Sequence, residues 1–353
     1  MRKGKRLIAW IMAVVMLFTI CVFGGNGTVE AAATTPVAKH GRLSVKGADL
    51  VDSKGNKFQL RGISTHGINW DVGSPYVNKK AFKTLRDDWG VNAIRLAMYT
   101  EEYNGYCSGG SQAKLRKLVD KGVGYATDLG MYAIIDWHIL SDGNPNKNKA
   151  QAKKFFTTMA KKYKNNKNVI YEICNEPNGC GWKEIKSYAT DIIKTIRKYD
   201  KKAVIIVGTP TWSQLGTDGT SNEVADSPIK GYKNIMYSLH FYASEWAHNE
   251  YLPAKVAYAR KKKLPIIVSE FGLSPASGDG AINKASADKW MKLLNKYNIS
   301  YFCWSLSNKN ESASLLKPST KKTSGWKSGD LSTAGKYIKK KYLARKKALG
   351  KKA

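Results

Sequence analysis

Short, nearly continuous runs of apolar residues recur along the chain from residue 58 onward. Few polar residues interrupt them, which is typical of strands that are covered on both faces. The eight runs are FQLRGIS at 58–64, AIRLAMY at 93–99, YAIIDWH at 132–138, VIYEICN at 169–175, VIIVGTP at 204–210, IMYSLHFY at 235–242, PIIVSEF at 265–271 and YFCWSLS at 301–307. They predict eight buried strands.

Most of the intervals between these runs carry a helical pattern. Apolar side chains recur at helical spacing over 155–163, 185–196 and 290–297. Gly90 and Gly130 follow helical runs and are expected C-caps. Eight strands that alternate with helices favour a closed (β/α)8 barrel. A doubly wound open sheet is the alternative, but it usually has a Gly-rich phosphate loop after its first strand, and none follows here.

The two ends of the chain differ from the middle. Residues 2–6 are mostly basic, residues 7–23 are almost wholly apolar, and Ala31-Ala32-Ala33 offers small residues for cleavage. An uncleaved membrane anchor is the alternative reading. We expect an exported, extracellular protein with three segments: a signal peptide (1–33), a single α/β barrel domain (34–345) and a basic C-terminal tail (346–353).

The formal net charge is +32. Nucleic acid is the usual partner of such a chain, but the lysines are spread along the whole sequence and no nucleic-acid motif accompanies them. We therefore expect no nucleic-acid partner. The densest stretch, YIKKKYLARKKALGKKA at 337–353, is either a solvated helix face with a frayed end or a surface that adheres to an anionic cell wall.

The cysteines show no metal-ligand spacing. Signal removal would leave Cys107, Cys174, Cys180 and Cys303. Cys174 and Cys303 lie within apolar runs, where a free cysteine packs as a small apolar side chain. Export permits a disulfide, but the spacing assigns none. We expect neither a metal nor another cofactor.

Polar residues collect where the predicted strands end. In a (β/α)8 barrel the carboxyl ends of the strands form one face, which carries the chemistry. The residues at these ends are His66, Arg95, Tyr99, Asp136, His138, Asn175, Glu176, His240, Tyr242, Glu270 and Trp304. Two carboxylates on one rim suit glycosidic cleavage, because one protonates the leaving oxygen and the other attacks or assists at the anomeric carbon. Such a pair could instead bind a metal, but the short-spaced histidines of metal sites are missing.

Several blocks around these residues carry a family resemblance. In chain order they are RGISTHGINW at 61–70, NAIRLAMY at 92–99, IIDWH at 134–138, YEICNEP at 171–177, LHFYA at 239–243, IVSEFG at 267–272 and CWSLSNKNES at 303–312. Together they resemble glycoside hydrolase family 5, and within it the bacterial endo-β-1,4-glucanases. The resemblance covers nearly the whole chain beyond the predicted signal peptide.

The resemblance implies roles for the two carboxylates and their neighbours. Glu176 matches the acid/base, Glu270 the nucleophile, and Asn175 the amide that holds the sugar 2-hydroxyl. Tyr242 is expected to hydrogen-bond the nucleophile. Trp304 matches the platform under the sugar at the −1 subsite, and its peptide bond to the next residue is expected to be cis.

The resemblance also implies a wider set of substrate-binding residues. Arg95, His138 and His240 match residues that orient the carboxylates and the substrate. The remaining candidates are His66, Trp70, Tyr99, Trp212, Lys309 and Glu311. Trp70 and Trp212 could instead be rim or core aromatics, Lys309 and Glu311 an exposed ion pair, and Asp136 a structural residue. We also expect the charge of Glu270 to raise the pKa of Glu176, so that Glu176 is protonated near neutral pH.

These residues predict a secreted, monomeric endo-β-1,4-glucanase. It would hydrolyse internal bonds of cellulose and related β-glucans by a retaining double displacement. Another β-glycanase of the family, such as a mannanase or a xylanase, is the nearest alternative. A non-catalytic polysaccharide-binding protein is the other class; it would keep Trp70 and Trp304 but lack one of the two carboxylates, and both are present.

Overall fold

The computed structural model describes residues 34–350. The predicted signal peptide at 1–33 and the last three residues of the predicted tail lie outside the described residues. Within residues 34–350, no helix combines the length and the apolar character needed to cross a membrane.

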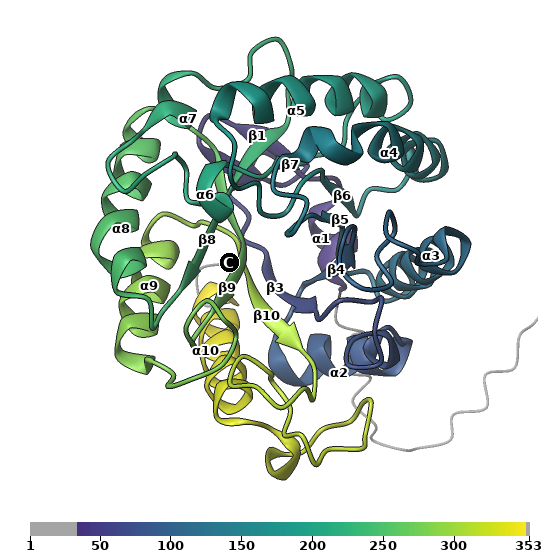
Figure 1. Ribbon diagram of the computed structural model, residues 1–353. Helices are drawn as coiled ribbons and strands as arrows, with labels where there is room; N and C mark the ends of the chain where they lie inside the picture. The colour runs from purple at the N-terminus through teal and green to yellow at the C-terminus, as the bar shows by residue number, and fades with distance from the viewer. Residues whose placement is uncertain (1–33, 351–353) are drawn as a thin grey trace, which may run out of the picture. The chain divides into compact units, whose positions relative to one another are not determined.

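Eight parallel strands close into a barrel with the neighbour order β10-β3-β4-β5-β6-β7-β8-β9 (Figure 1). The strands are β3 (Arg61–Thr65), β4 (Ala93–Tyr99), β5 (Tyr132–His138), β6 (Val169–Glu172), β7 (Ile205–Val207), β8 (Ile235–Tyr242), β9 (Ile266–Gly272) and β10 (Tyr301–Leu306). Every residue of these strands is buried, as expected for a parallel sheet with a filled interior and helices outside. The predicted (β/α)8 barrel is confirmed, and the open-sheet alternative is excluded.

Helices surround the barrel (Figure 1). The long ones are α2 (Lys79–Trp89), α3 (Gln112–Asp128), α4 (Lys149–Tyr163), α5 (Trp182–Arg197), α8 (Trp246–Lys261), α9 (Lys284–Lys296) and α10 (Thr333–Gly350). The short ones are α1 (Pro36–His40), α6 (Pro210–Ser213), α7 (Glu223–Asp226) and the 3-10 turns η1 (Ser74–Tyr76), η2 (Pro145–Asn148) and η3 (Ser328–Asp330). The three helices predicted from apolar spacing correspond to α4, α5 and α9. Between β7 and β8 the chain forms only α6 and α7.

Gly90 is the predicted cap of α2, whereas Leu129 takes the cap position of α3 and the predicted Gly130 follows it. Gly90 follows α2 with a left-handed φ of 75°, and its N–H donates to the Leu85 carbonyl. Gly130 has a φ of 61° one residue beyond the cap of α3. A residue with a side chain is strained in this conformation, so glycine is favoured at both ends.

Some predicted boundaries are wrong, for a common reason. The fourth strand ends at Glu172 rather than at Asn175, because the chain turns out of the ladder there and the Asn175 N–H donates to the Trp137 carbonyl at 3.2 Å. The fifth strand, β7, has only three residues of the seven predicted. Apolar composition continues through such departures, so it does not mark the residue at which strand pairing stops.

Helix α10 runs across the boundary that the charge pattern predicted between residues 345 and 346. Tyr342 is fully buried and donates to the Gly62 carbonyl at 2.8 Å. Arg345 Nε donates to Gln59 Oε1 at 2.8 Å. Residues 346–350 therefore continue a helix whose buried face, up to Tyr342, packs on the barrel, and they are themselves mostly exposed.

A small hairpin precedes the barrel. Strands β1 (Ser44–Lys46) and β2 (Asp49–Val51) pair antiparallel. Leu43 and Leu50 pack in one cluster with inward side chains of the barrel such as Tyr132 and Phe302. An added Cβ on Gly62 would lie 2.0 Å from the Phe302 ring, so only glycine fits at that point of β3.

Candidate active site

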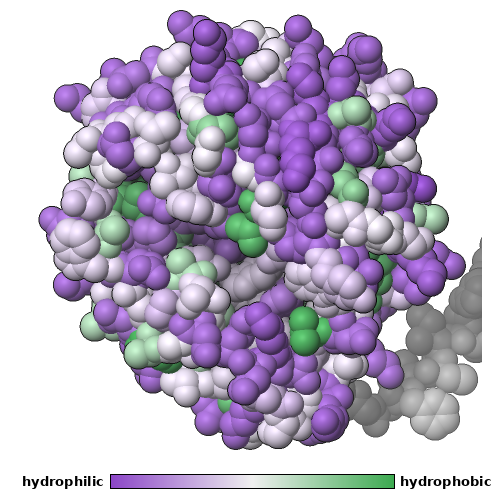
Figure 2. All heavy atoms as spheres, viewed as in Figure 1, coloured by the Kyte–Doolittle hydropathy of each residue, from purple (hydrophilic) through white to green (hydrophobic). Residues whose placement is uncertain are grey.

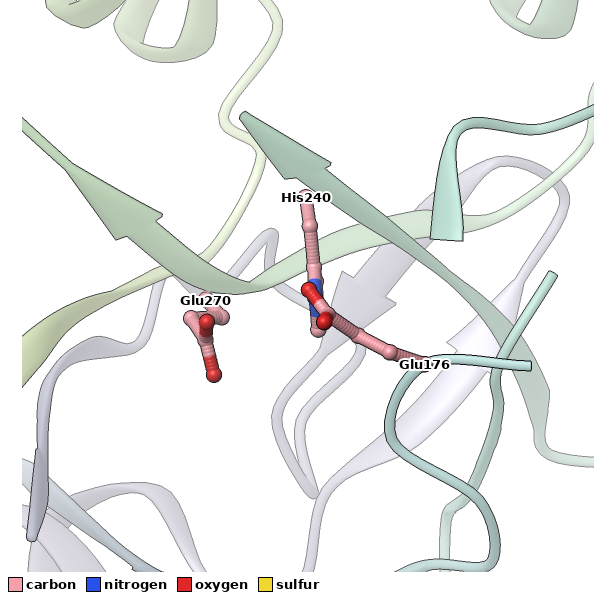
Figure 3. Close-up of side chains that lie close together, drawn as sticks. All are labelled: Glu176, His240 and Glu270. Carbon is pink, nitrogen blue, oxygen red and sulfur yellow. The ribbon is translucent and has the colours of Figure 1, made fainter. Parts of the chain in front are cut away.

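The two carboxylates expected on one rim lie close together. Glu270 is in β9, and Glu176 follows the end of β6 by four residues. One side-chain oxygen of each carboxylate and a ring nitrogen of His240 all lie within 4.8 Å of one another. In Figure 3 the Glu176 carboxylate lies against the His240 ring, and Glu270 stands beside them. Figure 2 shows the face viewed in Figure 1 hollowed near its centre.

Glu270 is held by two donors. The Tyr242 hydroxyl donates to Oε1 at 2.7 Å, and Arg95 Nη1 donates to Oε2 at 3.0 Å. The Glu270 side chain is 5% exposed. The hydrogen bond expected between Tyr242 and Glu270 is therefore present. Both oxygens accept hydrogen bonds from buried donors, and this fixes the orientation of the carboxylate.

Glu176 has a different environment. Its Oε1 lies 2.8 Å from His240 Nδ1, and its side chain is 13% exposed. Burial raises the pKa of Glu176 to about 8; Arg95 opposes this shift, while Asp136 and Glu172 add to it. The raised pKa agrees with the expectation, but the expected cause was wrong: desolvation and these two deeper acids act here, rather than the charge of Glu270.

Both histidines at this rim are buried. Burial lowers the pKa of His240 to about 4 and that of His138 to about 3. His240 Nε2 lies 2.9 Å from Ser269 Oγ, so both ring nitrogens have partners. His138 Nδ1 lies 2.6 Å from Asp136 Oδ2. Each ring is neutral near pH 7 and works as a hydrogen-bonding group of fixed orientation.

Arg95 connects the site to the barrel interior. It is fully buried and makes ion pairs with Asp136, Glu172 and Glu270 at 3.0, 2.7 and 3.0 Å. Its Nη2 donates to Asn175 Oδ1 at 2.6 Å. Burial raises the pKa of Asp136 to about 7 and also raises that of Glu172. One guanidinium thus faces three carboxylates.

Glu172 is a site residue that the sequence reasoning missed. It is fully buried in β6, four positions before Glu176. The sequence feature that could have identified it is a single carboxylate inside the apolar run VIYEICN. A carboxylate is unfavourable in a barrel wall unless a buried cation pairs with it. Asp136, expected to be structural, also contacts Arg95 and His138 without reaching the carboxylate pair.

The amide of Asn175 has a fixed orientation. Its oxygen accepts from Arg95, and its nitrogen donates to the Ile139 carbonyl at 3.1 Å. The same nitrogen lies 3.2 Å from His138 Nε2. The side chain is fully buried directly before Glu176.

Aromatic rings form one wall of the site. Trp304 stacks on His138 with ring centroids 5.2 Å apart and 21° between the planes, and His66 lies 5.2 Å from Trp304. Trp70 and Tyr99 pack at 4.5 Å. The structure therefore brings these five predicted residues together. The peptide bond after Trp304 is cis, as the resemblance implied.

Lys309 and Glu311 form an ion pair, but it is not an exposed one. The Glu311 side chain is 5% exposed, whereas that of Lys309 is 47% exposed, with 2.5 Å between Lys309 Nζ and Glu311 Oε2. Glu311 Oε1 lies 3.7 Å from His66 Nε2. Glu311 therefore lies next to the aromatic wall, and only its lysine partner reaches solvent.

Trp212 lies at the edge of the site. Its side chain is 47% exposed, which excludes a core role. Thr211, Trp212 and Ser213 have left-handed φ values of 56°, 52° and 63°. The Trp212 N–H donates to the Pro177 carbonyl at 3.0 Å, next to Glu176. Left-handed residues with side chains cost about 1–2 kcal/mol each, so surrounding contacts must hold this turn.

The four cysteines within the described residues are free thiols. The atoms of Glu176, His240 and Glu270 are close enough to hold a cation. However, both oxygens of Glu270 and one of Glu176 already have partners in Tyr242, Arg95 and His240. This arrangement orients two carboxylates for chemistry on a bond placed between them.

The sequence profile of the cellulase family, glycosyl hydrolase family 5, matches residues 51–310. The chain belongs to this family. It is 47% identical to an endoglucanase of Clostridium saccharobutylicum, over 95% of this chain and 72% of that relative. It is 45% identical to endoglucanase 5 of Pectobacterium carotovorum subsp. carotovorum, over 92% of this chain and 62% of the relative. On the basis of these identities over nearly the whole chain, this family 5 enzyme is an endoglucanase.

Solved structures agree with this assignment. The catalytic domain of a Thermobifida fusca endoglucanase is 37% identical with a TM-score of 0.81, over 88% of this chain and 99% of that domain. The same domain has been solved in complex with cellotetraose; that structure is 36% identical with a TM-score of 0.80, over 88% and 99% of the two chains. The alkaline cellulase K catalytic domain is 33% identical with a TM-score of 0.77, over 87% and 95%.

Proposed function

We propose that this family 5 endoglucanase cleaves internal β-1,4-glucosidic bonds with retention of configuration, with Glu270 as nucleophile and Glu176 as acid/base. The observation that carries the proposal is the separation of the two carboxylates, whose nearer oxygens lie within 4.8 Å. Retaining enzymes hold their carboxyl groups about 5–5.5 Å apart, whereas inverting enzymes need room for a water molecule between carboxylate and substrate.

In the first step the Glu270 carboxylate attacks the anomeric carbon. Glu176 donates its proton to the glycosidic oxygen as that bond breaks. The environments suit these roles. Arg95 and Tyr242 donate to Glu270, while burial keeps the pKa of Glu176 near 8 and therefore keeps it protonated at neutral pH.

In the second step the ionised Glu176 takes a proton from water. The resulting hydroxide equivalent attacks the anomeric carbon and releases the sugar from Glu270. His240 assists both steps as a positioning residue, because its Nδ1 lies 2.8 Å from Glu176 Oε1 and its other nitrogen is fixed by Ser269. Asn175, adjacent to Glu176, would face the 2-hydroxyl of the sugar.

The aromatic wall would bind the sugar on the side away from the leaving group. Trp304 would lie under the sugar that is attacked, with His66, Trp70 and Tyr99 extending the surface. Lys309 and Glu311 would add polar contacts, since Glu311 lies 3.7 Å from His66. The cellotetraose complex of the Thermobifida fusca enzyme supports a β-1,4-glucan as substrate.

The stereochemical course is the direct test. Proton NMR of the earliest product should show the β-anomer, and an initial α-anomer would exclude Glu270 as a covalent nucleophile. Glu270→Ala should abolish turnover of every substrate. Glu176→Ala should still react with an activated aryl cellobioside, and azide should then release a β-glycosyl azide. Assays on carboxymethylcellulose, mannan and xylan separate the glucanase from the other β-glycanases.

We further propose that the protein is exported as a monomer and associates with anionic cell walls through its lysines. The net charge of +32 supports this, and such attraction weakens as salt rises. N-terminal sequencing of secreted protein should find a mature end near residues 31–35; a chain that retains residues 7–23 would refute export with cleavage. Retention on isolated walls should fall between low and high salt.

A further inference from the structure

Five large apolar side chains are exposed within residues 34–350, and three of them lie between residues 212 and 251. Trp212, Trp246 and Tyr251 are 47%, 68% and 37% exposed. Trp246 is the first residue of α8, and its ring packs edge-on to that of Tyr251 with centroids 5.8 Å apart. Because α8 follows β8, Trp246 stands on the barrel face that carries the active site. Exposed aromatic side chains gathered beside a binding site indicate a further contact surface.

The backbone around Trp246 is fixed. Glu245 Oε1 accepts from the Ala276 N–H at 2.7 Å, which ties the start of α8 to the loop after β9. His248 Nδ1 accepts from the Tyr242 N–H at 2.9 Å, and Tyr242 holds the nucleophile. The exposure of Trp246 is therefore not that of a loose loop. The indole projects from a turn that is hydrogen-bonded directly to the active site.

The position of Trp212 relative to the scissile bond follows from the proposed role of Glu176. As the acid, Glu176 faces the oxygen of the leaving group. Trp212 donates from its N–H to the carbonyl of Pro177, the next residue, at 3.0 Å. Ser213 Oγ donates to the Asn175 carbonyl at 2.6 Å. Trp212 therefore lies on the leaving-group side of the scissile bond.

The segment after Trp212 connects it to α8. Lys255, which is 3% exposed, donates from Nζ to the Gln214 carbonyl at 3.1 Å. An added Cβ on Gly219 would lie 2.8 Å from the Tyr251 ring, so the backbone there rests on that ring. A continuous, packed surface thus leads from Trp212 along this segment to Tyr251 and Trp246.

We infer that Trp246 and Tyr251 form a distal platform for the leaving-group portion of a long β-glucan chain. The flat apolar face of a β-linked glucose ring stacks on an indole, and fixed aromatic rings lose little entropy on binding. A polymer substrate extends well beyond its cleavage point, so a chain that leaves over Trp212 meets this platform next. The inference rests on the proposed role of Glu176 as the acid.

Binding is measured on the full chain in a Glu270→Gln background, which prevents degradation of the polymer. Retardation in gels that contain hydroxyethyl cellulose, a neutral polymer, gives a dissociation constant without a contribution from net charge. Trp246→Ala should weaken binding about 5- to 30-fold, the effect of truncating an anchoring aromatic residue. Trp246→Phe should recover part of the loss. The matched control is Leu343→Ala. Leu343 is an apolar residue of α10 that is as exposed as Tyr251, and this variant should bind like its parent.

Kinetics separate the platform from the catalytic centre. With Glu270 intact, Trp246→Ala should lower kcat/KM on soluble polymer about 5- to 30-fold relative to kcat/KM on an aryl cellobioside, which is too short to reach α8. Unchanged polymer binding, or an equal loss on both substrates, would overturn the platform. An initial α-anomer from the parent enzyme would instead overturn the proposed mechanism, so the two failures are distinguishable.

Discussion

Deprotonation of Glu176 should cause the loss of activity at high pH, and this can be tested by measuring activity as a function of pH. Burial moves the pKa of Glu176 from 4.5 to about 8. At about 1.4 kcal/mol per pH unit, the folded site disfavours the ionised carboxylate by about 5 kcal/mol relative to water. About 90% of the free enzyme is then protonated at pH 7 and about 1% at pH 10.

The consequence depends on the leaving group. Cleavage of a soluble glucan needs protonation of a poor leaving group, so kcat/KM should fall about 50-fold between pH 8, where half of Glu176 is protonated, and pH 10. A 2,4-dinitrophenyl β-cellobioside needs no such proton, and its kcat/KM reports only the first step. Its profile should therefore remain flat through pH 8.

The assay compares both substrates from pH 5 to pH 10, with circular dichroism at each pH to verify that the fold persists. A shared limb near pH 8 on both substrates would assign the titration to a group other than the acid. A limb near pH 5 on the glucan would show that the site does not raise the pKa of Glu176. Either result refutes the reasoning. Glu176→Gln provides the control: its profile on the activated substrate should be as flat as that of the parent enzyme, and it should be inactive on the glucan.

Three further predictions concern the support of the site and the end of the chain. Tyr242→Phe removes a buried donor to the charged Glu270, so kcat/KM on an aryl cellobioside should fall about 10- to 100-fold at unchanged melting temperature, and a loss under 3-fold would contradict this. Asp136 has a pKa of about 7 in the folded protein, whereas its ordinary value is 3.8. Between these two pH values the folded state keeps a proton that the unfolded state releases. The free energy of unfolding should therefore decrease as the pH rises from 4 to 7. Asp136→Asn should reduce that slope by up to about 1.4 kcal/mol per pH unit in urea titrations, and identical slopes would exclude Asp136 as the source. Deletion of residues 346–353 should leave the melting temperature nearly unchanged. Arg345→Ala should lower the free energy of unfolding by about 1 kcal/mol, because it loses the hydrogen bond to Gln59. A larger loss for the deletion than for Arg345→Ala in calorimetry would show that the end of α10 carries the stability.

The sequence by itself determined the barrel and the residues at its rim. Apolar runs and helical spacing are local properties, and a buried parallel strand leaves both in the sequence. The end of a strand also has a local signature, since Glu176 directly follows the run VIYEICN and Glu270 is the next-to-last residue of the run PIIVSEF. Chain order alone then places both on one face, because all strands of a (β/α)8 barrel point the same way.

Only the tertiary structure decided how that rim is charged. The pKa of Glu176 depends on burial and on Asp136 and Glu172, and the orientation of Glu270 depends on Arg95. These groups come from different strands, and their electrostatic energies depend on distances and solvent exposure that no local pattern encodes. Glu172 was missed for this reason.

The surface of the molecule was decided in the same way. Charge density suggested that the chain leaves the fold after residue 345, but α10 continues to Gly350. The pair Lys309–Glu311 could have been exposed, yet Glu311 is buried beside His66. Trp246 could have been a core residue of α8, yet it is 68% exposed on the rim. Whether a side chain meets water depends on neighbours that are distant in sequence, so burial is determined only when the chain has folded.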